Sequence, residues 1–309
     1  MSEQAPDLRV RVGPMELKNP VMAASGTFGY GQEFAELFDP ALLGGIIVKG
    51  LSLKPRAGNP PPRIVETPCG MLNAIGLANV GLERFLGEKL PWLQALDTAV
   101  VVNIYGHSVS EYGELAGALR GVDGIDALEV NISCPNVEQG GMAFGTDPDA
   151  SARVTEAVLD RSDKPVIVKL SPNVTDIREP ARAVEQAGAH AISLINTITG
   201  MVVDVETHTP MLAHVTGGLS GPAIRPVAVR MVHEVVSTVG IPVIGGGGIM
   251  TARDAMEFLI TGACAVEVGT ASFVDPRATL EILDDLRDFC RNRGIPRVRD
   301  VIGTLKLEG

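Results

Sequence analysis

Short runs of apolar, mostly β-branched residues recur along the chain, and longer segments with helix signals separate them. Several runs are apolar at consecutive positions, which is typical of parallel strands covered on both faces. One helical segment shows clear end signals, with Thr251 as N-cap, Asp254 three residues later and Gly262 at its end. The pattern predicts eight strands, at residues 20–25, 45–50, 99–106, 127–133, 165–171, 191–197, 242–248 and 265–270.

Eight strand–helix units predict a closed (β/α)8 barrel, the TIM-barrel fold, as a single domain over residues 1–309. A doubly wound open sheet is the alternative, and it is disfavoured because no G-x-G-x-x-G fingerprint follows the first strand. Further helices are expected in "TDIREPARAVEQAG", starting at Thr175 or Asp176 with Pro180 near its start, and in "DPRATLEILDDLRDFCRNRG", closing at Gly294.

Two segments between predicted strands are too long for a simple barrel unit. They are residues 51–94, after the second strand, and residues 199–222, after the sixth strand. Long insertions in a compact domain are usually functional. We therefore expect both insertions to form lids or walls of a site.

Polar residues gather at the carboxyl ends of the predicted strands, where the active sites of such barrels lie. A buried lysine without a partner is costly, so two lysines with three asparagines at strand ends favour an anionic or carbonyl-rich ligand over a structural ion pair. The polar strand-end residues are Ser25, Lys49, Asn103, Asn131, Lys169, Asn196 and Thr270.

Glycine-rich turns follow the seventh and eighth predicted strands, as "GGGGI" and "VGT". Glycine lets backbone N–H groups approach a ligand closely. Barrels commonly build a phosphate site after these two strands, so Gly247, Gly248, Gly269 and Thr270 are candidates for one.

Cys134 lies in "EVNISCPNVEQGGMAFG", which begins like a buried strand and becomes polar and glycine-rich. From the residues alone it is a small buried apolar side chain, a metal ligand or a reactive group on a loop. Cys69, Cys264 and Cys290 are expected to be buried and inert. The five histidines show no paired spacing, and the four cysteines form no CxxC pair, so no metal site is expected.

Bulk composition narrows the function classes. Apolar residues make up 45% of 309 residues, enough for a large core, and the net charge of -11 argues against nucleic acid or an anionic membrane as the main partner. The first twenty residues contain no apolar signal region, and no run is long enough for a membrane span. A reducing, cytoplasmic location is expected.

The chain resembles the class 1 dihydroorotate dehydrogenases over nearly its whole length, from "NPVMAASGTFGYG" to "GTASF". The motifs that carry the resemblance are "IVKG", "GMLNAIGLANVG", "NISCPN", "VKLSPNVTDI", "INT", "GGLSGPAIRP" and "GGGGI". The resemblance implies an FMN-dependent barrel that oxidises dihydroorotate to orotate in pyrimidine biosynthesis. Cys134 would be the general base, and Lys49 would be the other catalytic residue.

The resemblance also implies which residues bind each ligand. The implied FMN ligands are Ser25, Lys49, Gly50, Asn103, Asn131, Lys169, Ile195, Gly221, Gly247, Gly248, Gly269 and Thr270. The implied ligands of dihydroorotate or orotate are Lys49, Asn73, Ala74, Ile75, Gly76, Leu77, Asn131, Asn196 and Thr197.

The chemistry suits these assignments. Oxidation of dihydroorotate removes a proton from C5 and a hydride from C6, which passes to flavin N5. A thiol with a pKa of about 8.5 can act as the base near neutral pH. Gly140, Gly141 and Gly145 would let its loop fold over the substrate and exclude water. Lys169 suits the N1/O2 edge of the flavin, where negative charge develops.

The form "NAIGLANVG" resembles the NAD-linked subclass (class 1B) rather than the fumarate-linked one, although Ala78 and Val80 depart from the usual pattern. In that subclass the chain would be the catalytic subunit. We expect a homodimer core that binds two copies of an iron–sulfur flavoprotein carrying FAD and a [2Fe–2S] cluster. Rival functions are a fumarate-linked enzyme, a dihydropyrimidine dehydrogenase-like enzyme, a Schiff-base aldolase using Lys49 or Lys169, and a non-catalytic scaffold.

Overall fold

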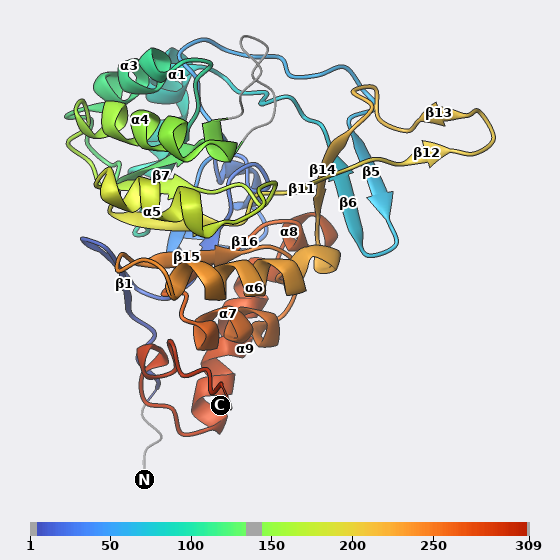
Figure 1. Cartoon of the computed structure of the whole chain (residues 1–309). Coiled ribbons are helices and arrows are strands. Elements are labelled where there is room, and N and C mark those ends of the chain that lie inside the picture. The colour runs from blue at the N-terminus through green and yellow to red at the C-terminus, as the bar shows by residue number, and fades with distance from the viewer. Residues whose placement is uncertain (1–4, 134–143, 308–309) are drawn as a thin grey trace.

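A computed structural model describes residues 5–133 and 144–307, and its centre is a closed barrel of eight parallel strands (Figure 1). The closure of the sheet confirms the predicted barrel and excludes the open-sheet alternative. Each predicted strand is present, somewhat shorter than expected. In chain order the barrel strands are β3 (Val21–Ala23), β4 (Gly45–Ile47), β7 (Ala99–Ile104), β8 (Ala127–Asn131), β9 (Val166–Lys169), β10 (Ala191–Leu194), β15 (Val243–Gly246) and β16 (Ala265–Val268).

Helices surround the barrel and bury the outer faces of its strands (Figure 1). Consecutive apolar positions place one side chain in the interior and the next against a helix, which is why these strands lack polar alternation. The helices are α1 (Leu82–Arg84), α2 (Leu90–Leu93), α3 (Val109–Leu119), α4 (Pro148–Leu159), α5 (Arg178–Gln186), α6 (Arg225–Val236), α7 (Ala252–Thr261), α8 (Ala271–Val274) and α9 (Ala278–Asn292).

Helix ends largely follow the sequence signals. The capping box of Thr251 and Asp254 is present at the start of α7, and Gly262 caps its end. The start of α5 was predicted two or three residues too early. Asp176 accepts a hydrogen bond from the backbone N–H of Arg178 (2.9 Å), so residues 175–177 form a turn and α5 begins at Arg178. Pro180 then falls in the first turn, where its missing N–H costs no helical bond.

The two long insertions pair with each other, although more than 100 residues separate them. They form an antiparallel sheet of β5 (Ile64–Thr67), β6 (Gly70–Asn73), β11 (Ile198–Gly200) and β14 (Gly217–Ser220), in the order β11-β14-β6-β5. A hairpin of β12 (Val203–Asp204) and β13 (Thr209–Pro210) extends from it. Figure 1 shows this wall sheet standing beside the barrel, which confirms the predicted site-wall insertions after strands two and six.

Short elements complete the chain. The hairpin of β1 (Val10–Val12) and β2 (Met15–Leu17) alternates buried and exposed residues, and both described ends of the chain lie at the same end of the molecule (Figure 1). Single helical turns are η1 (Gln32–Phe34), η2 (Pro40–Leu42), η3 (Phe85–Lys89), η4 (Phe144–Thr146), η5 (Pro222–Ile224) and η6 (Val298–Asp300). Within residues 5–133 and 144–307, no helix is both long enough and apolar enough to cross a bilayer.

Candidate active site

A cavity of about 710 Å³ opens at the carboxyl ends of the barrel strands and is bounded on one side by the wall sheet. Its volume is in the usual range for ligand and cofactor sites. The predicted site residues that line it are Ser25, Lys49, Gly50, Asn73, Ala74, Ile75, Gly76, Leu77, Asn103, Asn131, Lys169, Ile195, Asn196, Thr197, Gly247, Gly248, Gly269 and Thr270. Two predicted residues are not in this lining: Gly221 lies directly behind it, and Cys134 lies outside the described residues.

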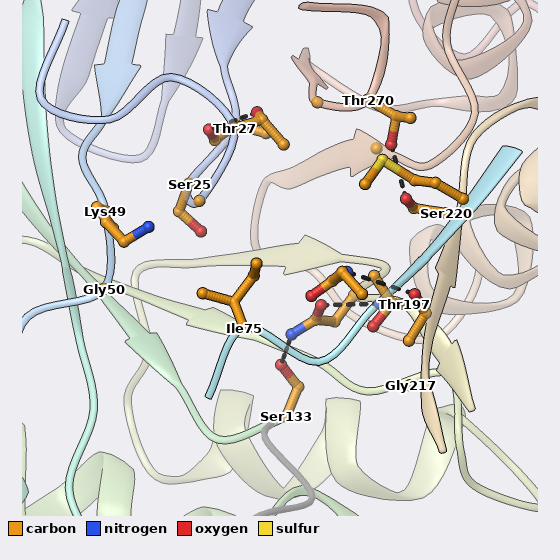
Figure 2. A pocket seen from close by; sticks show the side chains of 18 of the residues that line it. Ser25, Thr27, Lys49, Gly50, Ile75, Ser133, Thr197, Gly217, Ser220 and Thr270 are labelled. Carbon is orange, nitrogen blue, oxygen red and sulfur yellow. Dashed lines mark hydrogen bonds between the residues drawn. The ribbon is translucent and has the colours of Figure 1, made fainter. Parts of the chain in front are cut away.

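One end of the cavity is built from backbone that only glycine tolerates. Gly247 has a φ of 123° and Gly248 a φ of 77°. A Cβ atom on Gly248 would lie 2.7 Å from the carbonyl oxygen of Gly221. The Thr270 hydroxyl donates a hydrogen bond to Ser220 Oγ (2.8 Å), which joins the barrel to the wall sheet (Figure 2). Backbone this open suits a phosphate group, as predicted from the glycine-rich turns.

The barrel floor carries a cluster of charged residues that sequence reasoning partly missed. Lys169 Nζ donates to Glu267 Oε2 and lies 3.7 Å from Glu129 Oε2; we call these three residues the floor cluster. Glu129 also accepts hydrogen bonds from Asn103 Nδ2 (2.6 Å) and Ser193 Oγ (2.7 Å). Lys169 therefore forms the structural ion pairs that the sequence analysis had disfavoured relative to an anionic or carbonyl-rich ligand.

Burial and mutual charge set the pKa values of the floor cluster. Burial by itself lowers the pKa of Lys169, but the two adjacent carboxylates outweigh it and raise that pKa above its usual range. Burial, and then the Glu129 carboxylate, raise the pKa of Glu267 to about 8. For Glu129 burial is outweighed by the Lys169 ammonium and by its hydrogen-bond donors, so its pKa is lowered. Lys169 is thus a fixed cation rather than a neutral nucleophile.

Lys49 differs from Lys169 in its surroundings. It is half-buried at the cavity, and within the described part of the chain no carboxylate lies within 4.0 Å of its ammonium group. Burial, and then the nearby Arg63 guanidinium, lower the pKa of Lys49. Figure 2 shows its side chain directed into the cavity, on the same side of the view as Ser25. An ammonium group in this position is available to an anionic ligand.

The segment from Asn73 to Leu77 carries backbone strain where it borders the cavity. Leu77 has a φ of 57°, which is uncommon for a residue with a side chain, and Gly76 has a φ of 74°. Asn59 Nδ2 holds the segment by donating to the carbonyl oxygen of Ala74 (2.9 Å). In the described residues, nothing accepts a hydrogen bond from the backbone N–H groups of Ile75, Gly76 or Leu77. Strain beside free donors is typical of a binding site.

A chain of hydrogen bonds links the ends of β8 and β10. Asn196 Nδ2 donates to Ser133 Oγ, and Ser133 Oγ donates to Asn131 Oδ1 (2.7 Å). Asn173 Nδ2 donates to the carbonyl oxygen of Thr197 (3.0 Å). Ser133 and Thr197 lie on the same side of the cavity in Figure 2. These bonds fix the amide orientations before any ligand enters, which is the preorganisation that binding sites require.

Two buried polar atoms have no partner among the described residues: Asn103 Oδ1 and Glu267 Oε1. Both residues line the cavity. A Cβ atom on Gly50 would lie 2.9 Å from Asn103 Oδ1, so the absence of a side chain there leaves room beside the amide. Buried polar groups are nearly always satisfied, so unpaired atoms in residues that line a cavity favour a bound ligand that supplies the missing partners.

Comparison with known proteins identifies the family. The family model described as dihydroorotate dehydrogenase matches residues 7–290. The chain belongs to the dihydroorotate dehydrogenase family. The catalytic subunit of dihydroorotate dehydrogenase B (NAD(+)) from Geotalea daltonii is 57% identical over 98% of this chain and 99% of its own length. The subunits of the same name from Citrifermentans bemidjiense and Geobacter sulfurreducens are 57% and 55% identical, each over 98% of this chain and 100% of their own length.

Within this dihydroorotate dehydrogenase fold, four residues near the implied ligand sites escaped the sequence analysis: Glu129, Glu267, Ser133 and Asn173. The signal for the glutamates was a charged residue inside an otherwise apolar run, in "ALEVN" and "AVEVG". Ser133 and Asn173 stand inside the quoted motifs "NISCPN" and "VKLSPNVTDI", but no role was assigned to them.

The cysteine predictions had mixed outcomes. Cys290 is buried in α9 as expected. Cys264 is partly buried, with its thiol directed to the carbonyl oxygen of Val243, and burial raises its pKa to about 12. Cys69 was predicted to be buried and is exposed, because it lies at the turn between β5 and β6, outside the barrel.

Proposed function

We propose that this chain is the catalytic subunit of an NAD-linked dihydroorotate dehydrogenase, which uses FMN to oxidise dihydroorotate to orotate in pyrimidine biosynthesis. The observation that carries the proposal is the cavity itself. Residues from all seven motifs that resemble the family border one space at the strand ends. The near-full-length similarity to relatives named catalytic subunits of dihydroorotate dehydrogenase B (NAD(+)) supports the subclass. The domain we assign to this activity is the FMN-binding barrel of residues 1–309.

The cavity fits FMN at both ends. The glycine-rich backbone around Gly247, Gly248, Gly269 and Thr270, with Gly221 behind it, would hold the phosphate group. The unpaired oxygen of Asn103 and the ammonium of Lys169 would contact the polar edge of the isoalloxazine ring. The remaining ligands proposed for the cofactor are Ser25, Lys49, Gly50, Asn131 and Ile195. When bound, FMN supplies the hydride acceptor at N5.

The dihydroorotate site that we propose lies between the barrel floor and the wall sheet. Lys49 has no carboxylate partner among the described residues and would bind the substrate carboxylate, together with the free N–H groups of Ile75, Gly76 and Leu77. Asn73, Ala74, Asn131, Asn196 and Thr197 complete the proposed substrate ligands. Amide side chains both donate and accept, which matches the alternating donors and acceptors of a pyrimidine ring.

Cys134 is our proposed general base for the C5 proton. It lies outside the described residues, and the residue before it, Ser133, borders the cavity. A base must come within hydrogen-bond distance of the proton that it removes, so a cysteine next to Ser133 is well positioned along the chain for this role. Lys49 would stabilise the ionised substrate carboxylate while Cys134 accepts the proton.

We further propose that electrons leave through an iron–sulfur flavoprotein partner that carries FAD and a [2Fe–2S] cluster, bound to a homodimer of this chain. The relatives' names, which call them catalytic subunits, support a partner of some kind. Phe273 lines the cavity and is 53% exposed, and its neighbour Val274 is 72% exposed. Exposed apolar residues beside a cofactor cavity are what an electron-transfer interface needs at its centre.

Anaerobic mixing with dihydroorotate tests the proposal. The purified protein should be yellow, and dihydroorotate should bleach the flavin absorbance. Turnover with NAD+ should be slow until the partner is added. Rapid turnover with fumarate and no gain from the partner would support the fumarate-linked alternative. Bleaching by reduced pyrimidine bases but not by dihydroorotate would support a dihydropyrimidine dehydrogenase-like enzyme.

A further inference from the structure

The floor cluster contains more negative than positive groups. Glu129, Lys169 and Glu267 come from β8, β9 and β16, and they are 0%, 6% and 4% exposed. Two carboxylates and one ammonium would leave one uncompensated negative charge if all three groups were ionised. Because an unpaired charge is strongly unfavourable away from water, the cluster avoids it by retaining one proton. One of the two carboxyl groups must therefore carry that proton.

Hydrogen bonds show which carboxyl group it is. Glu129 accepts from Asn103 Nδ2 at 2.6 Å and from Ser193 Oγ at 2.7 Å, and it also faces the Lys169 ammonium. Donors of this kind stabilise the ionised form of a carboxyl group. Glu267 has Lys169 at one oxygen and shares a side-chain hydrogen bond with Glu129, which lowers the pKa of Glu129 and raises the pKa of Glu267. The retained proton therefore resides on Glu267.

Among the described residues, Glu129 and Lys169 are the charged groups that act on Glu267. The strands on either side of β16 place Met22 of β3 and Gly246 of β15 opposite Glu267, and neither residue titrates. Glu267 and Lys169 both line the cavity, so a change of charge in the cavity reaches the cluster directly.

We propose that Glu267 is a positioning residue that holds Lys169 against the bound cofactor and that, at a pH high enough to ionise it in the oxidised protein, takes up one proton from water when the cofactor is reduced. The inference rests on the proposed function. A hydride from dihydroorotate, which carries two electrons and one hydrogen, would add one negative charge to a cofactor bound next to Lys169. Glu267 molecules that are ionised at that moment each accept one proton, which removes the excess charge. At Glu267 only the O–H bond forms, and no bond to substrate is made or broken there.

The test is the midpoint potential of the FMN-loaded protein, measured with redox dyes from about pH 7 to about pH 10. Each additional proton taken up per two electrons makes the potential fall more steeply by about 30 mV per pH unit, since that is a tenfold change in equilibrium constant for a two-electron couple. The wild type should show such a steeper segment starting near the pKa of Glu267, about 8. A single constant slope over the whole range overturns the inference.

Variants assign the steeper segment to Glu267. Glu267→Gln should remove it, because glutamine cannot titrate. Glu129→Gln should move it to lower pH, because the Glu129 carboxylate raises the pKa of Glu267 and Glu267 would then have the Lys169 ammonium to itself. Retention of the segment in Glu267→Gln contradicts the inference.

A second measurement covers the case in which Glu267→Gln does not fold. Redox-difference infrared spectra of the wild type above pH 8 should show a protonated-carboxyl band that appears on reduction and shifts in D2O. The inference fails if no such band appears in a protein that binds flavin and is bleached by dihydroorotate. A protein that binds no flavin, or whose flavin dihydroorotate does not bleach, contradicts the proposed function instead.

Discussion

The barrel floor and the wall sheet face each other across one cavity, yet they are built in opposite ways. On the floor, side chains from five strands form a buried network around Glu129 and Lys169. On the wall, the cavity is bordered by glycine-rich backbone, and the N–H groups of Ile75, Gly76 and Leu77 have no acceptor within the described residues. The floor thus presents fixed charge, while the wall presents shape and backbone donors.

This difference teaches where each ligand is expected to bind. A buried ionic network is costly to assemble and to disturb, so it suits a cofactor that stays bound. Backbone donors in the partly exposed segment that follows β6 cost less to desolvate, so they suit a substrate that enters and leaves at every turnover. Variants of the two regions should accordingly separate cofactor retention from substrate affinity.

The largest effect on the reaction rate is expected from a substitution of the proposed general base. Cys134→Ser should keep FMN but slow flavin reduction by dihydroorotate near pH 7 by about 10²–10⁴-fold, because a hydroxyl is a far weaker base than a thiolate. Stopped-flow absorbance measures the rate. Cys69→Ser, at the exposed turn of the wall sheet, is the matched control and should reduce normally. Wild-type rates in Cys134→Ser would exclude the role of the general base.

A substitution in the floor cluster should lower both FMN binding and the thermal stability of the protein. Lys169→Ala leaves Glu129 and Glu267 without their counter-ion, and removal of one partner from a buried pair typically costs about 3–5 kcal/mol. We expect a lower Tm, loss of FMN and a lower flavin potential in whatever FMN remains. Flavin content and thermal unfolding measure these effects. Lys306→Ala, an exposed lysine near the C-terminus, is the control. Unchanged FMN content in Lys169→Ala would show that the floor cluster does not support cofactor binding.

A substitution in the segment after β6 should weaken dihydroorotate binding and leave FMN binding unchanged. In Gly76→Ala the new Cβ atom would lie 2.6 Å from atoms of Asn59, at a φ of 74° that alanine rarely adopts. The segment must shift, and strain of this kind costs about 1–3 kcal/mol. We expect KM for dihydroorotate to rise about 5-fold to 100-fold while FMN content stays normal. Gly87→Ala, which meets nothing within 4 Å, is the control. Loss of FMN in Gly76→Ala would contradict the division between floor and wall.

The smallest effect on ligand binding is expected from loss of the hydrogen bond that joins the barrel to the wall sheet. Thr270→Val removes the hydrogen bond from Thr270 to Ser220, which links the barrel to the wall sheet. A neutral hydrogen bond contributes about 1 kcal/mol, so FMN should bind about 5-fold more weakly. Flavin release on dilution, followed by fluorescence, measures the change. Thr207→Val removes a comparable bond on the exposed hairpin and should leave FMN binding unchanged. Equal FMN affinity in Thr270→Val and the wild type would show that this link does not support the cofactor site.

The sequence was sufficient for the barrel, the wall insertions and most of the cavity lining. Apolar runs and end signals are local, and the carboxyl ends of parallel barrel strands necessarily meet at one end of the barrel. Residues named from strand ends alone, such as Lys49, Asn103 and Thr270, therefore fall around one cavity. Motifs that resemble a family supplied the remaining ligands, including the segment from Asn73 to Leu77.

Only the tertiary structure decided how the charges are paired. Glu129, Lys169 and Glu267 lie on separate strands, and Lys169 and Glu267 are 98 residues apart in the chain. Their contact depends on barrel closure and strand register, which place Asn103 opposite Glu129 and Ser193 opposite Lys169. Local sequence carries no information on such long-range pairing. From the sequence, Lys169 was therefore interpreted as a ligand-binding residue, although two buried carboxylates lie next to it. The sequence was thus enough to predict which residues line the site, and the tertiary contacts decided how those residues are paired and which of them are ionised.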